Sequence, residues 1–174
     1  VSKAIARRMD QLCIDALNAA SSPSTVATSI GGAGTNMNIE KLRAAAKALN
    51  DNNVPAEGRH LLMHSSQLDA LLGETEVTSA DFATVKALVR GEINSFMGFN
   101  IITMGDRDEG GVPKPSTRSC FAWHESSMGY AESISQKSEV NYIPEKTSFL
   151  VSSMFSAGAV AIDDEGIVKI SCTE

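Results

Sequence analysis

Two histidines spaced four residues apart are the first pattern in this sequence that could do chemistry. His60 and His64 would share a face if residues 60–64 were helical, and two imidazoles so placed can bind zinc. The intervening Leu61-Leu62-Met63 favours a strand instead, and neither a carboxylate nor a cysteine stands at ligand spacing. We therefore expect surface or hydrogen-bonded histidines and no metal site.

Cys120 and His124 are the candidate pair for nucleophilic catalysis. Both point to the same side of a predicted strand, but positions four apart lie about 13 Å from each other along it. A cysteine nucleophile needs a base within hydrogen-bond reach and a third group that orients this base. Cys120 is therefore interpreted as a small buried apolar residue. An enzyme that uses Cys120 and His124 stays open as an alternative.

The remaining ligand-like motifs match known sites only in part. Gly31-Gly32-Ala33-Gly34 lacks the lysine and the hydroxyl residue of a P-loop, and Met37 stands where a dinucleotide fingerprint needs its third glycine. The acidic groups at 106–109 and 163–165 lack the alternating oxygen ligands of an EF-hand. The sequence thus predicts no catalytic, cofactor-binding or metal-binding residue, and a protein that is not an enzyme.

Charge and composition narrow the class of protein further. The net charge is −6, and the largest basic cluster is the pair Arg7-Arg8, so we expect no specific binding of nucleic acid. No apolar run approaches the roughly 20 residues that cross a bilayer, so no membrane contact is expected. Three cysteines favour free thiols in a reducing compartment. The sequence opens on a charged helix without a signal peptide, and its start at Val1 indicates a processed product or a fragment.

A long first helix is predicted over residues 3–20, because apolar residues recur there at helical spacing. The predicted buried stripe consists of Val1, Ile5, Met9, Leu12 and Ala16. This stripe is thin, so the helix needs a large partner. The Gly-rich and Ser-rich residues 21–37 predict a mobile loop without a regular element.

Helices come first and strands last in the rest of the chain, which indicates an α+β fold. The predicted helices are 39–50, with Asn38 as its N-cap, 65–72 and 78–91, and the predicted strands of this part are 59–64 and 95–104, with a bend at Gly98. A charged loop follows at 105–117. The later predicted strands are 118–124, 132–143, 147–162 and 166–172, with residues 163–166 as a hairpin turn between the last two.

This order of segments resembles the major capsid proteins of tailed bacteriophages, those with the Hong Kong 97-type shell fold. Two motifs carry the resemblance: Val54-Pro55-x-x-Gly58-Arg59 before a strand, and Gly91-x-Ile93 followed by Gly98-Phe99. Residues 156–162 and 166–170 look like the closing strands of such subunits. The resemblance implies a long spine helix, a peripheral β-sheet and an axial domain of mixed sheet with flanking helices.

The resemblance also implies a division of the chain into three parts. Residues 1–36 would hold the spine helix and a flexible loop of the peripheral domain, residues 37–130 the axial domain, and residues 131–174 the strands that return to the peripheral domain. Family members usually carry an N-terminal arm and an extended loop ahead of the spine helix. This sequence starts at that helix, so either those parts were removed or the shell is built differently.

The function implied by the resemblance is that of a structural subunit of an icosahedral phage or prophage head. Its partners would be copies of itself in hexameric and pentameric capsomers, together with scaffold and portal proteins. It would belong to the virion capsid and assemble in the bacterial cytoplasm. A phage-associated or host binding module, of the scaffold or decoration type, stays open as an alternative.

Charged residues of both signs are the candidates for contacts between subunits. They are Arg7 and Arg8 on the predicted spine helix, and Asp106, Arg107, Asp108 and Glu109 in the charged loop. In a cyclic ring each copy meets the next head to tail, so one surface must complement a different one. The charged loop offers both charge signs for such a contact, and a solvated hairpin loop stays open as the alternative.

Overall fold

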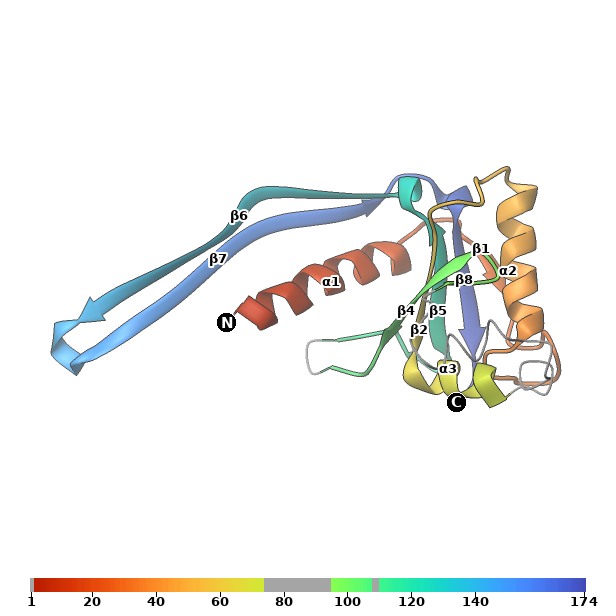
Figure 1. Cartoon of the computed structure of the whole chain (residues 1–174), viewed down its shortest axis with the longest axis horizontal. Coiled ribbons are helices and arrows are strands. Elements are labelled where there is room, and N and C mark those ends of the chain that lie inside the picture. The colour runs from red at the N-terminus through yellow and green to blue at the C-terminus, as the bar shows by residue number, and fades with distance from the viewer. Residues whose placement is uncertain (1, 74–94, 108–109) are drawn as a thin grey trace.

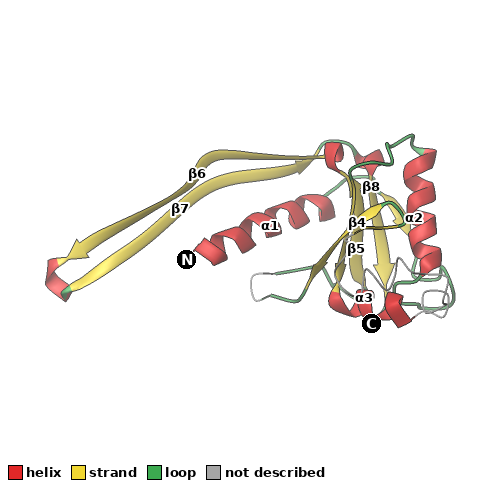
Figure 2. Ribbon diagram, in the orientation of Figure 1, coloured by secondary structure: helices red, strands yellow, loops and turns green. Residues whose placement is uncertain are grey.

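Two sheets of very different shape make up the structure (Figure 1, Figure 2). This computed structural model describes residues 2–73, 95–107 and 110–174. A six-stranded sheet has the strand order β1-β8-β5-β2-β4-β3, and a separate pair of long strands extends away from it. The strands of the larger sheet are β1 (Ser24–Val26), β2 (Arg59–His64), β3 (Ser95–Phe96), β4 (Phe99–Met104), β5 (Arg118–His124) and β8 (Ile167–Cys172).

Helices pack on both faces of the larger sheet. They are α1 (Ser2–Asn18), α2 (Ile39–Asp51) and α3 (Ser65–Gly73). Side chains of a strand alternate between faces, so Leu61 of β2 belongs to the core cluster under α2 with Leu42. Its neighbour Leu62 belongs to a second cluster on the α1 side, with Ile14 and Leu17. Helices around this mixed parallel and antiparallel sheet confirm the predicted α+β class.

Short sequence patterns predicted the bounds of several helices and strands to within a few residues. The helix predicted at 39–50 is α2, and the side chain of Asn38 caps it by accepting a 2.8 Å hydrogen bond from the backbone N–H of Lys41. The strands predicted at 59–64, 118–124 and 166–172 correspond to β2, β5 and β8. The helix predicted at 78–91 lies outside the described residues.

The buried stripe of α1 differs from the predicted one. Ile5 and Ala16 are buried as expected, whereas Met9 and Leu12 are only partly buried. Ile14 and Leu17 are buried instead, because the C-terminal end of α1 packs against the larger sheet while the rest of the helix follows the long strands (Figure 1). A single stripe cannot describe a helix that changes its partner along its length.

Residues 21–37 hold a strand that the sequence did not predict. Ser24–Val26 forms β1, which pairs in parallel with β8, and Val26 is 3% exposed. The prediction of a loop without regular structure was therefore wrong for this segment, because pairing with a distant strand outweighed its local composition. The buried Lys41 also holds the loop, since its Nζ donates to the carbonyls of Thr35 (2.6 Å) and Ser171 (3.0 Å).

Residues 95–104 form two strands rather than one. Met97 and Gly98 both have positive φ (52° and 83°), which reverses the chain in a two-residue turn and places Phe96 opposite Phe99. The expectation of a simple strand bend at Gly98 was therefore wrong. Gly98 tolerates this backbone conformation because it has no Cβ.

The turn at 163–166 joins the two sheets and does not close a hairpin. Asp164–Gly166 is a 3-10 turn, η3, between a long strand of the arm and β8. β8 pairs with β5 and β1, so it belongs to the larger sheet. The apolar Ile167, Val168 and Ile170 are 0% exposed, which explains this central position. Among the described residues, no helix is long and apolar enough to cross a membrane.

Candidate assembly surface

A long two-stranded ribbon, here called the arm, leaves the larger sheet and passes the N-terminal end of α1 (Figure 1). It consists of β6 (Met128–Ile143), the 3-10 turn η2 (Pro144–Lys146) and β7 (Ser148–Ala161). The strands are antiparallel over nearly their whole length. An isolated two-stranded ribbon is marginally stable in water, and three or more strands or a packed helix are normally needed. The arm therefore needs a covering partner.

α1 covers the inner half of the arm. Phe155, Ala157, Ala159 and Ala161 are partly buried, whereas the residues between them are exposed, so one face of β7 lies toward the helix. A helix of 17 residues is about 26 Å long and a strand of 14 residues is about 46 Å long, so α1 reaches only about half of β7. The outer half of the arm extends beyond the helix (Figure 1).

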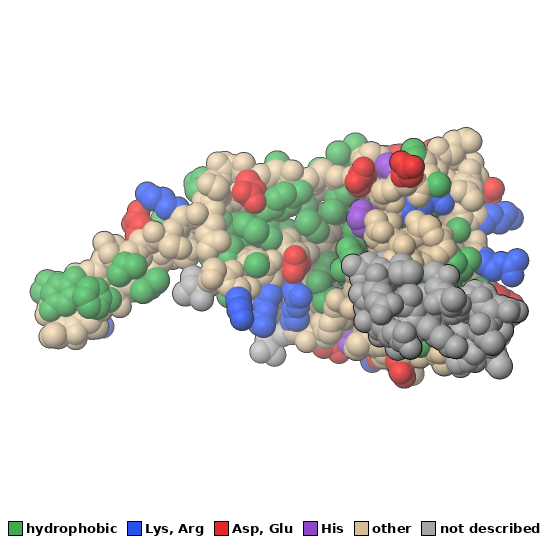
Figure 3. Space-filling model, viewed as in Figure 1, with side chains coloured by type: hydrophobic (Ala, Val, Ile, Leu, Met, Phe, Trp, Pro, Cys, Tyr) green, Lys and Arg blue, Asp and Glu red, His purple; other side chains and the backbone are tan. Residues whose placement is uncertain are grey.

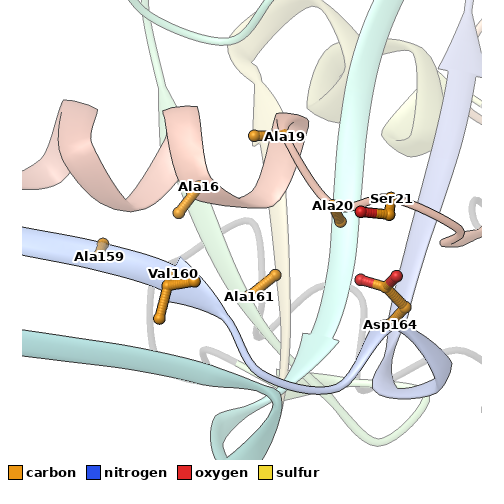
Figure 4. Close-up of a pocket in the computed structure, with 8 residues that line it drawn as sticks. All are labelled: Ala16, Ala19, Ala20, Ser21, Ala159, Val160, Ala161 and Asp164. Carbon is orange, nitrogen blue, oxygen red and sulfur yellow. The ribbon is translucent and has the colours of Figure 1, made fainter.

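Small side chains let the inner end of α1 approach β7 closely. Ala16, Ala19 and Ala20 line a cavity of about 190 Å³ together with Ala159 and Ala161, and Figure 4 shows these residues at the end of α1 and on β7. The one titratable side chain on its lining is Asp164, and the Asp164 Oδ2 accepts a 2.9 Å hydrogen bond from the backbone N–H of Ser22. This cavity is a packing gap between helix and strand and holds no set of groups for catalysis.

The outer half of the arm carries an apolar surface, here called the tip face. It consists of Val140, Tyr142, Phe149 and Val151, which are 64%, 54%, 72% and 53% exposed. Val140 lies opposite Val151 and Tyr142 opposite Phe149, with the two rings 5.3 Å apart. Figure 3 shows hydrophobic side chains gathered at this end of the arm.

The tip face continues the side of the arm that α1 covers. Both register shifts of the ribbon place the extra residues in β6, between Glu132 and Lys137, so β7 alternates without interruption. Phe149 and Val151 therefore share a face with Phe155, which lies toward α1. The same apolar side is thus covered by a helix near the sheet and left open at the outer end.

Two 3-10 turns, here called the elbow, connect the arm to the larger sheet. They are η1 (Glu125–Ser127) and η3 (Asp164–Gly166). The carbonyl of Ser127 accepts from the backbone N–H groups of Ile162 (2.9 Å) and Asp163 (3.3 Å). Asn52 Nδ2 donates to the carbonyl of Glu165 at 2.7 Å, which ties η3 to the end of α2. These bonds fix the direction in which the arm leaves the sheet.

The charged loop lies against α1, so the structure brings two groups of predicted contact residues close together. Arg107 Nη1 is 3.2 Å from Asp10 Oδ2, and the side chain of Gln11 accepts from the backbone N–H of Gly111 at 2.8 Å. On the same helix Arg7 and Arg8 are exposed, and Arg8 Nη1 is 3.9 Å from Asp15 Oδ2. Asp108 and Glu109 lie outside the described residues.

Arg118 holds the base of the charged loop through two carboxylates. Its side chain is 2% exposed, and its guanidinium donates to Asp106 (2.6 and 3.2 Å), to Glu174 (2.7 Å) and to the carbonyl of Val112 (3.1 Å). Lys114 forms a further ion pair with Glu174. The hydrogen bonds from Arg118 lower the pKa of Asp106, and those from Arg118 and Lys114 lower the pKa of Glu174.

Replacing Glu174 with Gln is expected to weaken the dependence of stability on pH in acid. The folded state lowers the pKa of Glu174, so the ion pairs stabilise the fold above the unfolded-state value of about 4.3 and lose this contribution as the pH falls below it. After allowance for screening by solvent, we expect the unaltered chain to lose about 1 kcal/mol more than the variant between pH 6 and pH 3. Thermal unfolding followed by circular dichroism across this range measures the difference.

The control for this experiment is Glu145→Gln at the exposed outer end of the arm. This variant should keep the pH dependence of the unaltered chain. Parallel pH profiles for the Glu174→Gln variant and the unaltered chain would contradict the role given to this carboxylate.

The catalytic alternative receives no support from the geometry. Cys120 is 0% exposed, and a hydrogen bond with Cys172 together with burial raises the pKa of its thiol. Because the thiolate is the reactive form, this environment opposes nucleophilic chemistry. His124 Nδ1 lies 2.7 Å from Ser126 Oγ, in the cap of η1. The described part of the chain holds no group of three or more side chains able to bind a metal ion.

Comparison with known proteins identifies the family of this chain. The model of the phage capsid protein family matches residues 1–174, the whole chain. The chain belongs to the phage capsid protein family. The resemblance that the segment order indicated is thereby confirmed. No curated protein sequence matches this capsid chain.

Solved phage structures share the fold of this capsid chain at low sequence identity. A structure of Mycobacterium phage Che8 is 20% identical with a TM-score of 0.72, and the match covers 97% of this chain and 60% of that one. The capsid of cyanophage P-SCSP1u is 16% identical with a TM-score of 0.70, covering 99% and 64%. The capsid of Helicobacter pylori bacteriophage KHP30 is 11% identical with a TM-score of 0.70, covering 95% and 65%. The capsid chain therefore spans about three fifths of the length of these proteins.

The tip face was missed by the sequence analysis of this capsid chain. Both strands of the arm were predicted, but nothing indicated that they leave the sheet together. One signal was present in Phe149-Leu150-Val151, three consecutive large apolar residues beside a turn. On a strand with one buried face, apolar residues alternate with polar ones, so such a run indicates a strand that needs cover on both faces.

Proposed function

We propose that this chain is a structural subunit of a phage head shell, which joins copies of itself in hexameric and pentameric capsomers of the virion capsid. The observation that carries the proposal is the tip face, an apolar surface on a projecting ribbon that no described residue covers. Large apolar surfaces left open in this way mark sites of protein association. In the shell a neighbouring copy covers the tip face.

The size of the tip face fits a shell contact better than an independent binding partner. Its two aromatic side chains expose about 250 Å², since each aromatic buries about 150–250 Å² when fully covered. A stable pair of proteins needs about 800 Å² on each partner. In a shell each subunit makes several such contacts at once, so individually weak contacts suffice.

The charged candidates add a second contact between subunits in this proposal. Arg7 and Arg8 on α1 and the neighbouring Asp106 and Arg107 of the charged loop form one charged surface, which meets a different surface of the next copy. This arrangement suits head-to-tail association around a ring. Scaffold and portal proteins are further partners of such a subunit, which assembles in the bacterial cytoplasm and needs no enzymatic activity of its own.

Sedimentation velocity and negative-stain electron microscopy of the concentrated chain test the proposal. We expect rings or larger shells that form as the concentration rises. A chain that stays monomeric at every concentration in both measurements would contradict self-assembly and would favour the binding-module alternative.

The same measurements test Arg107 as a contact between subunits. Arg107→Glu should leave the unfolding midpoint within a few degrees of that of the unaltered chain, because exposed ion pairs contribute little, yet reduce the assembled fraction at least tenfold. The double variant Asp10→Arg with Arg107→Glu restores the ion pair within the chain and serves as the control. If this double variant assembles normally, Arg107 acts only within its own subunit.

A further inference from the structure

The two outer edges of the arm differ in how well they are protected from pairing with another strand. A ribbon of two strands leaves one edge of β6 and one edge of β7 without a partner among the described residues. Exposed edges present unpaired N–H and C=O groups, and monomeric proteins block them with charges, prolines and bulges. The distribution of these features along the arm shows which edge is kept open.

The edge of β6 is blocked. It has two register shifts, between Glu132 and Ile134 and between Ile134 and Lys137, which interrupt a regular ladder. It also carries Glu132, Lys137 and Glu139, the last two joined by a 2.8 Å ion pair. A strand from another chain would meet both irregular backbone and charge along this edge.

The edge of β7 has none of these features. Ser148–Ala161 contains no charged residue and no proline, and its backbone is regular. Near the sheet, Ala159, Val160 and Ala161 line a cavity with the end of α1, so the helix lies beside this part of the strand. The outer residues Ser148–Met154 lie beyond the helix, and their edge is open.

We propose that Ser148–Met154 is an edge-pairing site that takes the same segment of a second copy in antiparallel orientation. This inference rests on the proposed shell function and names the contact through which the arm acts. The segment is free of charge, so two copies meet along it without repulsion between like charges and without burying an ionised side chain. Pairing along β7 makes one four-stranded sheet from two arms.

The geometry of this pairing also explains why the tip face is apolar although α1 does not cover it. A two-fold axis perpendicular to the sheet leaves corresponding faces of both copies on the same side. The two tip faces therefore join into one apolar surface, twice the area of either, with an α1 helix near each end. Three or more strands with a continuous apolar face are stable where a single ribbon is marginal. Edge pairing thus stabilises the part of the arm that its own helix does not reach.

A lysine on each edge in turn tests the proposal. Ser152→Lys places a charge on the open edge, and Ser135→Lys adds the same charge to the blocked edge of β6 as the matched control. In sedimentation velocity we expect Ser152→Lys to raise the concentration needed for assembly at least tenfold, and Ser135→Lys to change it less than twofold. Equal effects of the two variants would overturn the proposal.

Chemical cross-linking tests the same contact in chains that still assemble, because it detects which residues of two copies lie close together. Cys120 and Cys172 are buried, so Ser152→Cys in a Cys13→Ser background leaves one accessible thiol. A short bismaleimide should then give a covalent dimer through residue 152, whereas Ser135→Cys in the same background should stay monomeric on a denaturing gel. Dimers from both variants, or from neither, would overturn edge pairing along β7.

The outcomes also separate this inference from the proposed function. If the unaltered chain assembles and Ser152→Lys assembles equally well, edge pairing is wrong and the shell function stands. If the unaltered chain does not associate at any concentration, both are wrong.

Discussion

Replacing Tyr142 and Phe149 together with serine is expected to abolish assembly while the larger sheet stays folded. Both side chains are more than half exposed and their rings pack against each other, so we expect their loss to cost the isolated subunit about 1 kcal/mol. In the proposed shell contact a neighbouring copy covers the same rings. Truncation of an aromatic hot spot costs about 2 kcal/mol, so the loss of two of them lowers the association constant by several hundredfold.

The measurement pairs sedimentation velocity with thermal unfolding of the same sample. The control is Val160→Ser with Ile162→Ser, which removes two apolar side chains of similar exposure (61% and 68%) near the elbow. This control should assemble normally, because these residues lie outside the tip face. If both double variants lose assembly equally, general surface hydrophobicity drives association and the tip face has no special role.

The sequence predicted those elements whose signals are local. Asn38 identified the start of α2 because its cap depends on a residue only three positions away. The strands β5 and β8 were predicted within a residue because both are largely buried and carry short apolar runs, Cys120–Trp123 in β5 and Ile167-Val168 in β8. In such segments burial and propensity agree, so neighbouring residues alone are sufficient.

The features that the sequence did not predict depend on distant partners. β1 is a strand only because β8, about 140 positions later, pairs with it. Arg118 holds Asp106 and Glu174 together across the end of the sheet, and nothing in the sequence around either carboxylate indicates this. The tip face is the clearest case, since its exposure depends on the length of α1 relative to that of β7.

Gly166→Ala is expected to change the direction of the arm and to reduce assembly. Gly166 lies in η3 at the elbow, and an added Cβ would overlap Ser127 Oγ and come 2.9 Å from Ser127 Cβ in η1. Ser127 is 1% exposed and its carbonyl accepts backbone hydrogen bonds from Ile162 and Asp163, just before η3, so its Cβ cannot shift away without straining these bonds. Overpacking of this kind costs about 1–3 kcal/mol. We therefore expect a lower unfolding midpoint together with a loss of assembled material.

A second substitution, at Ser127, tests whether the overlap with this residue causes the effect of Gly166→Ala. Ser127→Gly removes the two atoms that the new Cβ would overlap, so the double variant with Gly166→Ala should recover most of the lost stability and assembly. Gly158→Ala is the matched control. Gly158 lies on the arm, and an added Cβ there would have no neighbouring atom within 4 Å. If Gly166→Ala is as harmless as Gly158→Ala, the elbow is not rigid. The direction of the arm would then be set by neighbouring subunits and not by the fold of the chain.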